Sequence, residues 1–336
     1  DEAGANASSG ALAANYTLTG GTHNFAINRK SVNISGTREY DGTTNIAAAD
    51  ISTITDTVNS EVLAMSGGLG TTSSANVGAY NLTDTSQGTL ILANGPSGAN
   101  QGLASNYTLT GGTQDYTITQ RVLSSSGSKA YDANTNALAA DITLSNLVSG
   151  ETLNHSGTAS VSSANAASYT ITNLAGITLA DNAGLASNYT LTGGTHNFTV
   201  NPKVISLSGS RLYDATTDAV ASDLTTISGL VGSETLNLSG TGSVTNANVA
   251  SNKTVTLGTL ALADNSGLAA NYTLSGGTHQ LTINQRPLAA TVARQYDGTK
   301  TAAGSDLSSF DALQGGETLT LSGSGTVGDE NVANGQ

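Results

Sequence analysis

The sequence contains no cysteine and no tryptophan, and only three of its 336 residues are proline. The lack of cysteine excludes a disulfide framework and any metal site built from thiolates. Charged residues make up 10% of the chain and aromatic residues 4%. Disorder by composition needs high charge together with low hydrophobicity, so the 37% of hydrophobic residues indicates a folded chain.

Basic residues are scarce as well: 11 Lys and Arg against 24 Asp and Glu leave a formal net charge of −13. Nucleic-acid binding requires a basic face, so no nucleic-acid partner is expected. No apolar run approaches the roughly 18 residues that a membrane-spanning helix needs, and no membrane span is predicted. No signal peptide is recognisable, so we expect any export signal to lie outside these residues.

What the chain does contain is an internal repeat, shown by three markers that keep step with one another. The intervals between successive copies of the first marker are 91, 82 and 83 residues. Asn-Tyr-Thr-Leu-Thr/Ser-Gly-Gly-Thr starts at Asn15, Asn106, Asn188 and Asn271; the Tyr-Asp pair at Tyr40, Tyr131, Tyr213 and Tyr296; and Glu-Thr/Val-Leu at Glu61, Glu151, Glu234 and Glu317. Most of the excess in the first interval falls near 95–101, which we predict to be a lengthened surface loop.

The register of the markers predicts the domain organisation. Residues 1–29 are the C-terminal part of a preceding repeat, and 286–336 are the N-terminal part of a fourth. Three full repeats lie between them, at 30–120, 121–202 and 203–285. We therefore expect the sequence to be a window on a longer tandem array.

Each repeat has the pattern of β-strands. Phe198 and Val200 alternate with polar neighbours, as do Ile205 and Leu207, and this period of two is typical of a half-buried strand. The phase slips at Gly258, which indicates a bulge or tight turn. No helical period of useful length is present, and a β-solenoid would need a shorter repeat. We predict an all-β chain: a tandem array of small β-sandwich repeats, Ig-like or β-grasp-like, of about 82 residues each, forming an elongated rod.

The Tyr-Asp-Gly/Ala motif is the sharpest local signature. We expect its Tyr ring to be buried with the hydroxyl bonded to backbone, and its Asp to close an Asx-turn with the Thr or Asn that follows. Because Ala133 and Ala215 take the place of glycine in two of the four copies, a positive φ is not expected there. A basic residue two positions before each Tyr suggests weak ion pairs with the acids.

Acidic residues also recur in register, and they are the only candidate metal ligands. The calcium candidates are Asp50, Glu61, Asp141, Glu151, Asp223, Glu234, Asp306 and Glu317. Carboxylates gathered with carbonyl oxygens could hold Ca²⁺ within or between repeats. Single acids so far apart also suit turn caps or solvated side chains, and both interpretations stay open. No other cofactor is expected.

Nothing in the sequence predicts catalysis. His23, His196 and His279 occupy one repeat position, at which the remaining copy has Gln114. Catalysis would not survive that exchange, and no nucleophile with a partner base is visible. We predict that these side chains lie on a strand surface and that the protein is not an enzyme.

The run 204–217, followed by Gly-Ser-Glu-Thr-Leu at 232–236, and the run 188–203 together resemble the YDG-type repeats. These are similar to the MBG repeats of very large bacterial surface adhesins of the filamentous-haemagglutinin, two-partner-secretion class. The resemblance covers the whole chain. It implies export through an outer-membrane partner, display outside the cell on the bacterial surface, and work in cell–cell, host or biofilm-matrix attachment.

Three functions follow as hypotheses. The leading one is a structural stalk of a secreted adhesin, whose partners are the neighbouring repeats of a longer chain. The second is a subunit of a polymeric extracellular fibre or sheath, which binds other copies of itself. The third is a set of carbohydrate-binding repeats that contact a polysaccharide or host surface through exposed aromatic residues.

Overall fold

The computed structural model describes residues 15–81, 86–171 and 174–331. Strands make up 43% of the structure, and the described residues contain neither a helix of seven residues or more nor a closed barrel. The prediction of an all-β chain is therefore confirmed. Contacts divide the chain into two compact units: unit 1 comprises 1–123, 146–154 and 180–193, and unit 2 comprises 124–145, 155–179 and 194–336. The repeat boundaries inferred from the markers stay a prediction.

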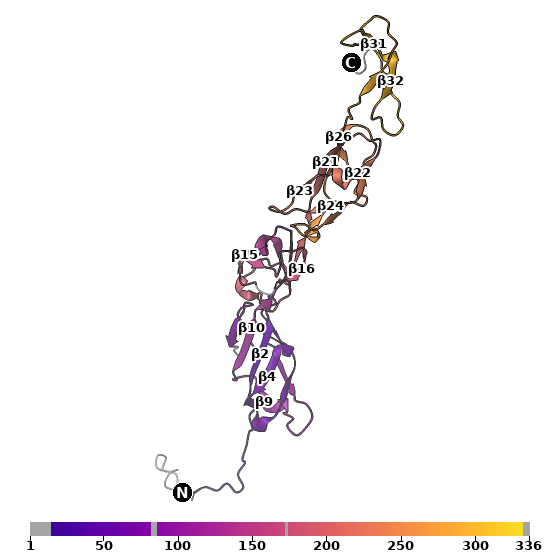
Figure 1. Cartoon of the computed structure of the whole chain (residues 1–336). Coiled ribbons are helices and arrows are strands. Elements are labelled where there is room, and N and C mark those ends of the chain that lie inside the picture. Colours follow the sequence, from indigo (N-terminus) through magenta and orange to yellow (C-terminus); the bar gives the residue numbers. More distant parts are fainter. Residues whose placement is uncertain (1–14, 82–85, 172–173, 332–336) are drawn as a thin grey trace. The chain divides into compact units, whose positions relative to one another are not determined.

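Unit 1 is built from short strands and single 3-10 turns (Figure 1). Its strands are β1 (Lys30–Ser31), β2 (Asn33–Glu39), β3 (Asn45–Ala47), β4 (Ile51–Thr55), β5 (Leu63–Gly67), β6 (Leu69–Thr71), β7 (Gly78–Asn81), β8 (Ile91–Asn94), β9 (Tyr107–Thr108), β10 (Gln114–Thr119), β11 (Arg121–Val122) and β18 (Tyr189–Thr190). Its 3-10 turns are η2 (Ala48–Asp50), η3 (Val58–Ser60), η4 (Ala104–Asn106) and η6 (Ala186–Asn188).

Unit 2 repeats the same pieces. Its strands are β12 (Ser124–Ala130), β13 (Asn136–Leu138), β14 (Ile142–Ser145), β16 (Ala167–Thr170), β19 (His196–Asn201), β20 (Lys203–Val204), β21 (Ser206–Leu212), β22 (Asp218–Val220), β23 (Thr226–Ser228), β24 (Asn237–Ser239), β25 (Thr241–Ser243), β26 (Ala250–Thr254), β27 (Ala261–Ala263), β28 (Tyr272–Thr273), β29 (His279–Asn284), β30 (Ala290–Val292), β31 (Thr301–Ala303), β32 (Leu307–Phe310) and β33 (Ser324–Thr326). Strands β15 (Asn154–Ser160) and β17 (Ile177–Ala180) belong to it except for one terminal residue each, and its 3-10 turns are η5 (Ala139–Asp141), η7 (Ala221–Asp223), η8 (Ala269–Asn271) and η9 (Gly304–Asp306).

A four-stranded mixed sheet recurs three times, in the orders β4-β2-β10-β7, β14-β12-β19-β16 and β23-β21-β29-β26. The two central strands are parallel in each sheet, and the outer strands are antiparallel to them. The central pair consists of the first long strand and the last strand of each repeat segment. An Ig-like sandwich is built from antiparallel sheets. Here the last strand of each segment pairs in parallel with the first long strand, so the topology differs from the Ig-like alternative.

The predicted alternation of the last strand is confirmed by its burial. In β19, Phe198 and Val200 are buried while Asn197 and Asn201 are exposed, and β10 follows the same pattern. Burying one apolar face of a strand removes nonpolar area from water at about 25 cal/mol per Å². Unit 1 has a core cluster of Val32, Ile34, Leu63, Leu90, Tyr107 and Leu109.

The turn predicted at Gly258 is confirmed, and residues 95–100 lie between strands. Gly258 has a φ of +53° and lies in a turn where the strand pattern changes phase. Residues 95–100 form no strand, and the loop closes where the Val62 N–H donates to Asn100 O (2.8 Å) and Val62 O accepts from the Gly102 N–H (2.8 Å). The extra residues therefore extend a loop without changing the sheet.

Candidate functional site

A pair of tyrosines on one glutamate is the recurring polar cluster of the structure. In unit 1 the Tyr40 hydroxyl donates to Glu151 Oε1 at 2.5 Å, and the Tyr189 hydroxyl donates to Glu151 Oε2 at 2.6 Å. The two rings meet edge to face with centroids 5.4 Å apart. Tyr40 comes from segment 30–120, whereas Glu151 and Tyr189 come from segment 121–202. We call this cluster a tyrosine–glutamate node.

The same node is found in unit 2. The hydroxyls of Tyr131 and Tyr272 donate to the two carboxylate oxygens of Glu234, each at 2.6 Å, and the ring centroids are again 5.4 Å apart. A tyrosine of one segment is thus held by the glutamate and the second tyrosine of the following segment. The arrangement repeats because all three residues keep their register in the sequence.

Two further glutamates hold one tyrosine each. Glu61 accepts from the Tyr107 hydroxyl at 2.6 Å, within one segment. Glu317 accepts from the Tyr213 hydroxyl, between segments 203–285 and 286–336. We call each of these two positions, in which one glutamate holds a single tyrosine, a half-node.

A second layer of bonds fixes each complete node. The Val148 N–H donates to the Tyr189 hydroxyl at 3.1 Å, so this oxygen both accepts and donates. The adjacent Asn188 is buried; its Oδ1 accepts from the Val77 N–H at 2.9 Å and its amide donates to Asn76 Oδ1 at 3.0 Å. Asn271 makes the matching bonds in unit 2. Buried polar groups with partners on both sides specify one geometry.

The electrostatics keep the node tyrosines protonated. Burial, followed by the bond to Glu151, raises the pKa of Tyr40 to about 12, and the pKa of Tyr189 is raised to about 12 by the same two causes. Burial and the bond to Glu234 raise the pKa of Tyr131 to about 12. A hydroxyl that stays protonated remains a donor, and a bond to a carboxylate is stronger than one between neutral groups.

The Tyr-Asp-Gly/Ala turn places the first tyrosine of the node. Asp41 Oδ1 accepts from the Thr43 N–H at 2.8 Å, which confirms the predicted Asx-turn. Arg38 pairs with Asp41 and also donates to Thr43 O, and the expected basic–acidic pairing recurs in the other three copies. Burial opposes ionisation of Asp41, but the bonds from Thr43 and the charge of Arg38 lower its pKa overall.

The prediction about the third residue of this turn is wrong. The φ values are +79° at Gly42, +63° at Ala133, +64° at Ala215 and +73° at Gly298, all in the left-handed region. Left-handed backbone costs a residue with a Cβ about 1–2 kcal/mol. The Asp bonds and the node hold the turn in this shape, so the two alanines follow the conformation of the glycines.

The expected backbone partner of the Tyr hydroxyl is also wrong. The Tyr40 and Tyr131 rings are buried as predicted, but their hydroxyls bond to side chains more than one hundred residues away. One signal pointed to this: each glutamate keeps register with both tyrosines. The distance between them in the chain concealed the contact.

The eight calcium candidates divide into two separate sets. The glutamates lie in the nodes and half-nodes described above. Among the aspartates, Asp50 and Asp306 each accept a backbone N–H at 2.9 Å, from Ala47 and Ala303, while Asp223 lies 3.7 Å from Arg211 and burial raises its pKa. Within the described residues no three His, Cys, Asp or Glu side chains gather in a group that could hold a metal. Calcium binding by Asp141 and the other candidates stays a prediction.

His196 and His279 are buried, so the predicted strand-surface place is wrong for these two copies, whereas His23 is exposed. His279 Nδ1 accepts from the Leu207 N–H at 3.2 Å and its Nε2 lies 2.8 Å from Leu274 O. Gln114 makes the same two contacts: its Oε1 accepts from Ile34 N–H at 3.1 Å and its amide donates to Leu109 O at 2.9 Å. The shared bonding pattern explains why His and Gln exchange here.

Comparison with known families bears on residues 115–280. The YDG domain family matches this stretch twice, at 115–197 and at 196–280. Residues 115–280 thus hold two stretches that match the YDG domain family. Each matched stretch runs from the last strand of one segment to the last strand of the next, so it includes the Tyr-Asp turn and a node glutamate. No curated protein matches the chain. In the described ranges, no helix has the length and apolar character needed to cross a bilayer.

Proposed function

We propose that these YDG-type repeats form a mechanical spacer: the stalk of a secreted bacterial surface adhesin, displayed outside the cell, which holds a binding region away from the surface. The observation that carries the proposal is the tyrosine–glutamate node. It ties segment 30–120 to 121–202, and 121–202 to 203–285, through partly buried, charge-assisted bonds, and it leaves one connecting residue between β10 and β11, namely Gln120.

The sheet topology supports the same role. In a parallel pair, the start of the first strand and the end of the last strand lie at opposite ends. Consecutive segments therefore continue head to tail, and an elongated rod of small β-domains follows as part of the proposal. Tension applied through the connectors would shear β2 against β10 along six register pairs at once. Breaking several bonds together needs more force than opening them one after another.

The carbohydrate-binding alternative has less support. The large exposed aromatics of the described residues are Tyr16, Phe25 and Tyr296. Each is the counterpart of a residue that is buried in the complete segments, such as Tyr189, Phe198 and Tyr40. In the complete segments the same positions are covered by packed strands, so a sugar-binding role is not needed to account for these aromatic residues.

Single-molecule stretching between the chain ends tests the mechanical role. We expect discrete opening steps, each releasing about 280 Å for a repeat of 82 residues, and a lower opening force when the node bond is removed in Tyr40→Phe. A chain that extends without discrete steps would contradict the spacer. Labelling of intact cells of the source bacterium by an antibody raised against the chain tests the location.

A further inference from the structure

Two junctions join the three complete segments, and they share their main contacts. The contacts of the first junction, between 30–120 and 121–202, lie in unit 1, and those of the second, between 121–202 and 203–285, lie in unit 2. Each junction has a tyrosine–glutamate node, a pair of two-residue parallel strands (β11 with β18, β20 with β28) and a buried asparagine, Asn188 or Asn271, that bonds to the preceding segment. Differences between the junctions therefore come from the residues around these contacts.

The connecting residue differs between the two junctions. At the first junction the amide of Gln120 donates to Ser187 O at 3.1 Å and to Tyr189 O at 2.9 Å. Tyr189 is a node residue, so this side chain ties the connector to the segment that follows it. The register of the repeat puts Pro202 at the second junction. Proline has no side-chain amide and no backbone N–H, so neither bond can form there.

Two more bonds cross the first junction. The Val122 N–H donates to Glu39 Oε1 at 2.7 Å, and the guanidinium of Arg121 donates to Tyr40 O at 3.3 Å. Each bond involves a charged group, and such bonds are stronger than those between neutral groups. They hold the start of the second segment against the Tyr-Asp turn of the first.

The second junction lacks both of these bonds. Ala130 stands at the place of Glu39 and offers no side-chain acceptor to Val204, which is 49% exposed. Lys203 stands at the place of Arg121, and its ammonium has no partner within the described residues. The side-chain bonds that surround the node of the first junction therefore have no counterpart at the second in the part of the chain that the structure describes.

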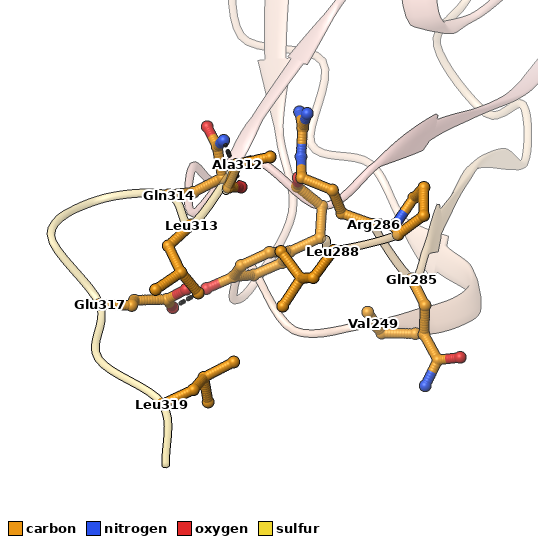
Figure 2. Close-up of a pocket in the computed structure, with 11 residues that line it drawn as sticks. Val249, Gln285, Arg286, Leu288, Ala312, Leu313, Gln314, Glu317 and Leu319 are labelled. Atoms are coloured by element: carbon orange, nitrogen blue, oxygen red, sulfur yellow. Dashed lines mark hydrogen bonds between the residues drawn. The ribbon is translucent and has the colours of Figure 1, made fainter. Parts of the chain in front are cut away.

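The junction that follows the second one is again similar to the first. Its connector carries Gln285 and Arg286, both labelled in Figure 2. The Arg286 side chain donates to Tyr213 O at 2.7 Å, as Arg121 does to Tyr40 O. The contact from a junction arginine to the carbonyl of the preceding tyrosine therefore recurs, and the second junction departs from the pattern.

We propose that the second junction is a weak link built into the array: it opens before the first junction, both in thermal fluctuations and under tension. Each bond that is missing raises the equilibrium constant for opening several-fold. The ring of Pro202 fixes one backbone angle of the connector but holds no surfaces together. A spacer with such a junction extends by parting two segments there, before any four-stranded sheet is sheared. The use of the weak link under tension rests on the proposed spacer function, whereas the difference between the junctions does not.

Hydrogen exchange of the whole chain, read by site-resolved mass spectrometry, compares two matched backbone amides. Leu123 donates to Thr190 O at 2.8 Å at the first junction, and Ile205 donates to Thr273 O at 3.0 Å at the second. Both side chains are buried, so these amides exchange when the junction opens. We expect the amide of Ile205 to exchange about 10- to 100-fold faster than that of Leu123, after correction for intrinsic rates.

Moving the surrounding residues of the first junction to the second tests the cause. Ala130→Glu, Pro202→Gln and Lys203→Arg together should slow the exchange of Ile205 to the rate of Leu123. The amides of the central strands β12 and β19 should keep their exchange rates, which verifies that the triple variant is folded.

Glu39→Ala is a milder change in the opposite direction, since Glu39 is exposed. It removes one bond to a carboxylate and should speed the exchange of Leu123 about 3- to 10-fold. Asp115→Ala is the matched control. Asp115 is also exposed and accepts from the amide of Asn81 in its own segment, so its loss should leave the exchange of Leu123 unchanged.

Three results would contradict the weak link: equal exchange at Leu123 and Ile205, faster exchange at Leu123, and a folded triple variant in which the exchange of Ile205 is unchanged. Exchange reports on the junctions without tension, so these results would leave the spacer function standing. A chain that extends without discrete steps would contradict the spacer even where Ile205 exchanges faster. The two failures are therefore distinguishable.

Discussion

At the scale of single residues, the left-handed alanines of the Tyr-Asp-Ala turns offer a direct test. Ala133→Gly and Ala215→Gly should each stabilise the protein by about 0.5–1 kcal/mol, because relief of left-handed strain exceeds the added freedom of the unfolded chain. The shift in the midpoint of urea unfolding measures this.

The reverse change supplies the control. Gly298→Ala should destabilise by a similar amount through left-handed strain alone. Its Cβ would meet nothing closer than the Tyr296 hydroxyl at 3.9 Å, so no steric clash adds to the cost. Gly42→Ala should cost more, because its Cβ would lie 2.9 Å from Val148. A loss of stability in Ala133→Gly would show that the turn is not left-handed in solution.

The buried histidine makes a second residue-scale prediction. His279→Gln should change the unfolding free energy by less than about 1 kcal/mol, because Gln114 makes the same bonds at the same place. His279→Leu should cost about 1–3 kcal/mol by leaving the Leu207 N–H and Leu274 O without partners. Equal stability of the two variants would contradict the assigned bonds.

At the scale of elements, the sequence predicted individual strands better than their neighbours. Alternation at Phe198 and Val200 identified β19 because burial of one face leaves a period of two. Alternation carries no information about which strand lies beside it, so the parallel pairing of β12 with β19 could not be predicted. The burial of Gln114 and His279 could not be predicted. In the sequence, a buried polar residue whose hydrogen bonds go to backbone groups looks the same as a polar residue exposed to solvent.

The nodes predict a loss of stability at high pH. The folded pKa of Tyr40, Tyr131 and Tyr189 is about 12, above the unfolded value of about 10. The stabilisation is therefore complete below pH 10 and is lost as the pH rises through 12. Unfolding midpoints measured across this range should fall, and Tyr40→Phe should reduce the fall because it removes one titrating group.

The control for the node uses a tyrosine outside it. Tyr169 donates to Asn165 O at 2.6 Å within its own segment. Tyr169→Phe should leave the alkaline fall as steep as in the unchanged protein. If both variants behave alike, the loss of stability does not come from the nodes.

At the scale of the whole molecule, a single repeat length accounts for two features: the recurring order of strands in the four-stranded sheets and the recurring tyrosine–glutamate nodes. The markers of the sequence recur together because the tyrosine of one segment must meet the glutamate of the next. Spacing alone predicted that the segments repeat. It did not predict how they join, because Tyr40 and Glu151 lie in different repeats and only the folded chain brings them to 2.5 Å.

The last prediction concerns shape. Strands of about eight residues span roughly 26 Å at 3.3 Å per residue. With turns a segment should reach about 35 Å, and four joined head to tail about 140 Å, on the same rise per residue. A thin rod of that length has a radius of gyration near its length divided by √12, which is about 40 Å. A single compact domain of this size would have a radius of gyration of about 20 Å.

Small-angle scattering at low concentration should give the larger radius of gyration. A result near 20 Å would mean that the segments fold back on one another, and the spacer would have to be abandoned.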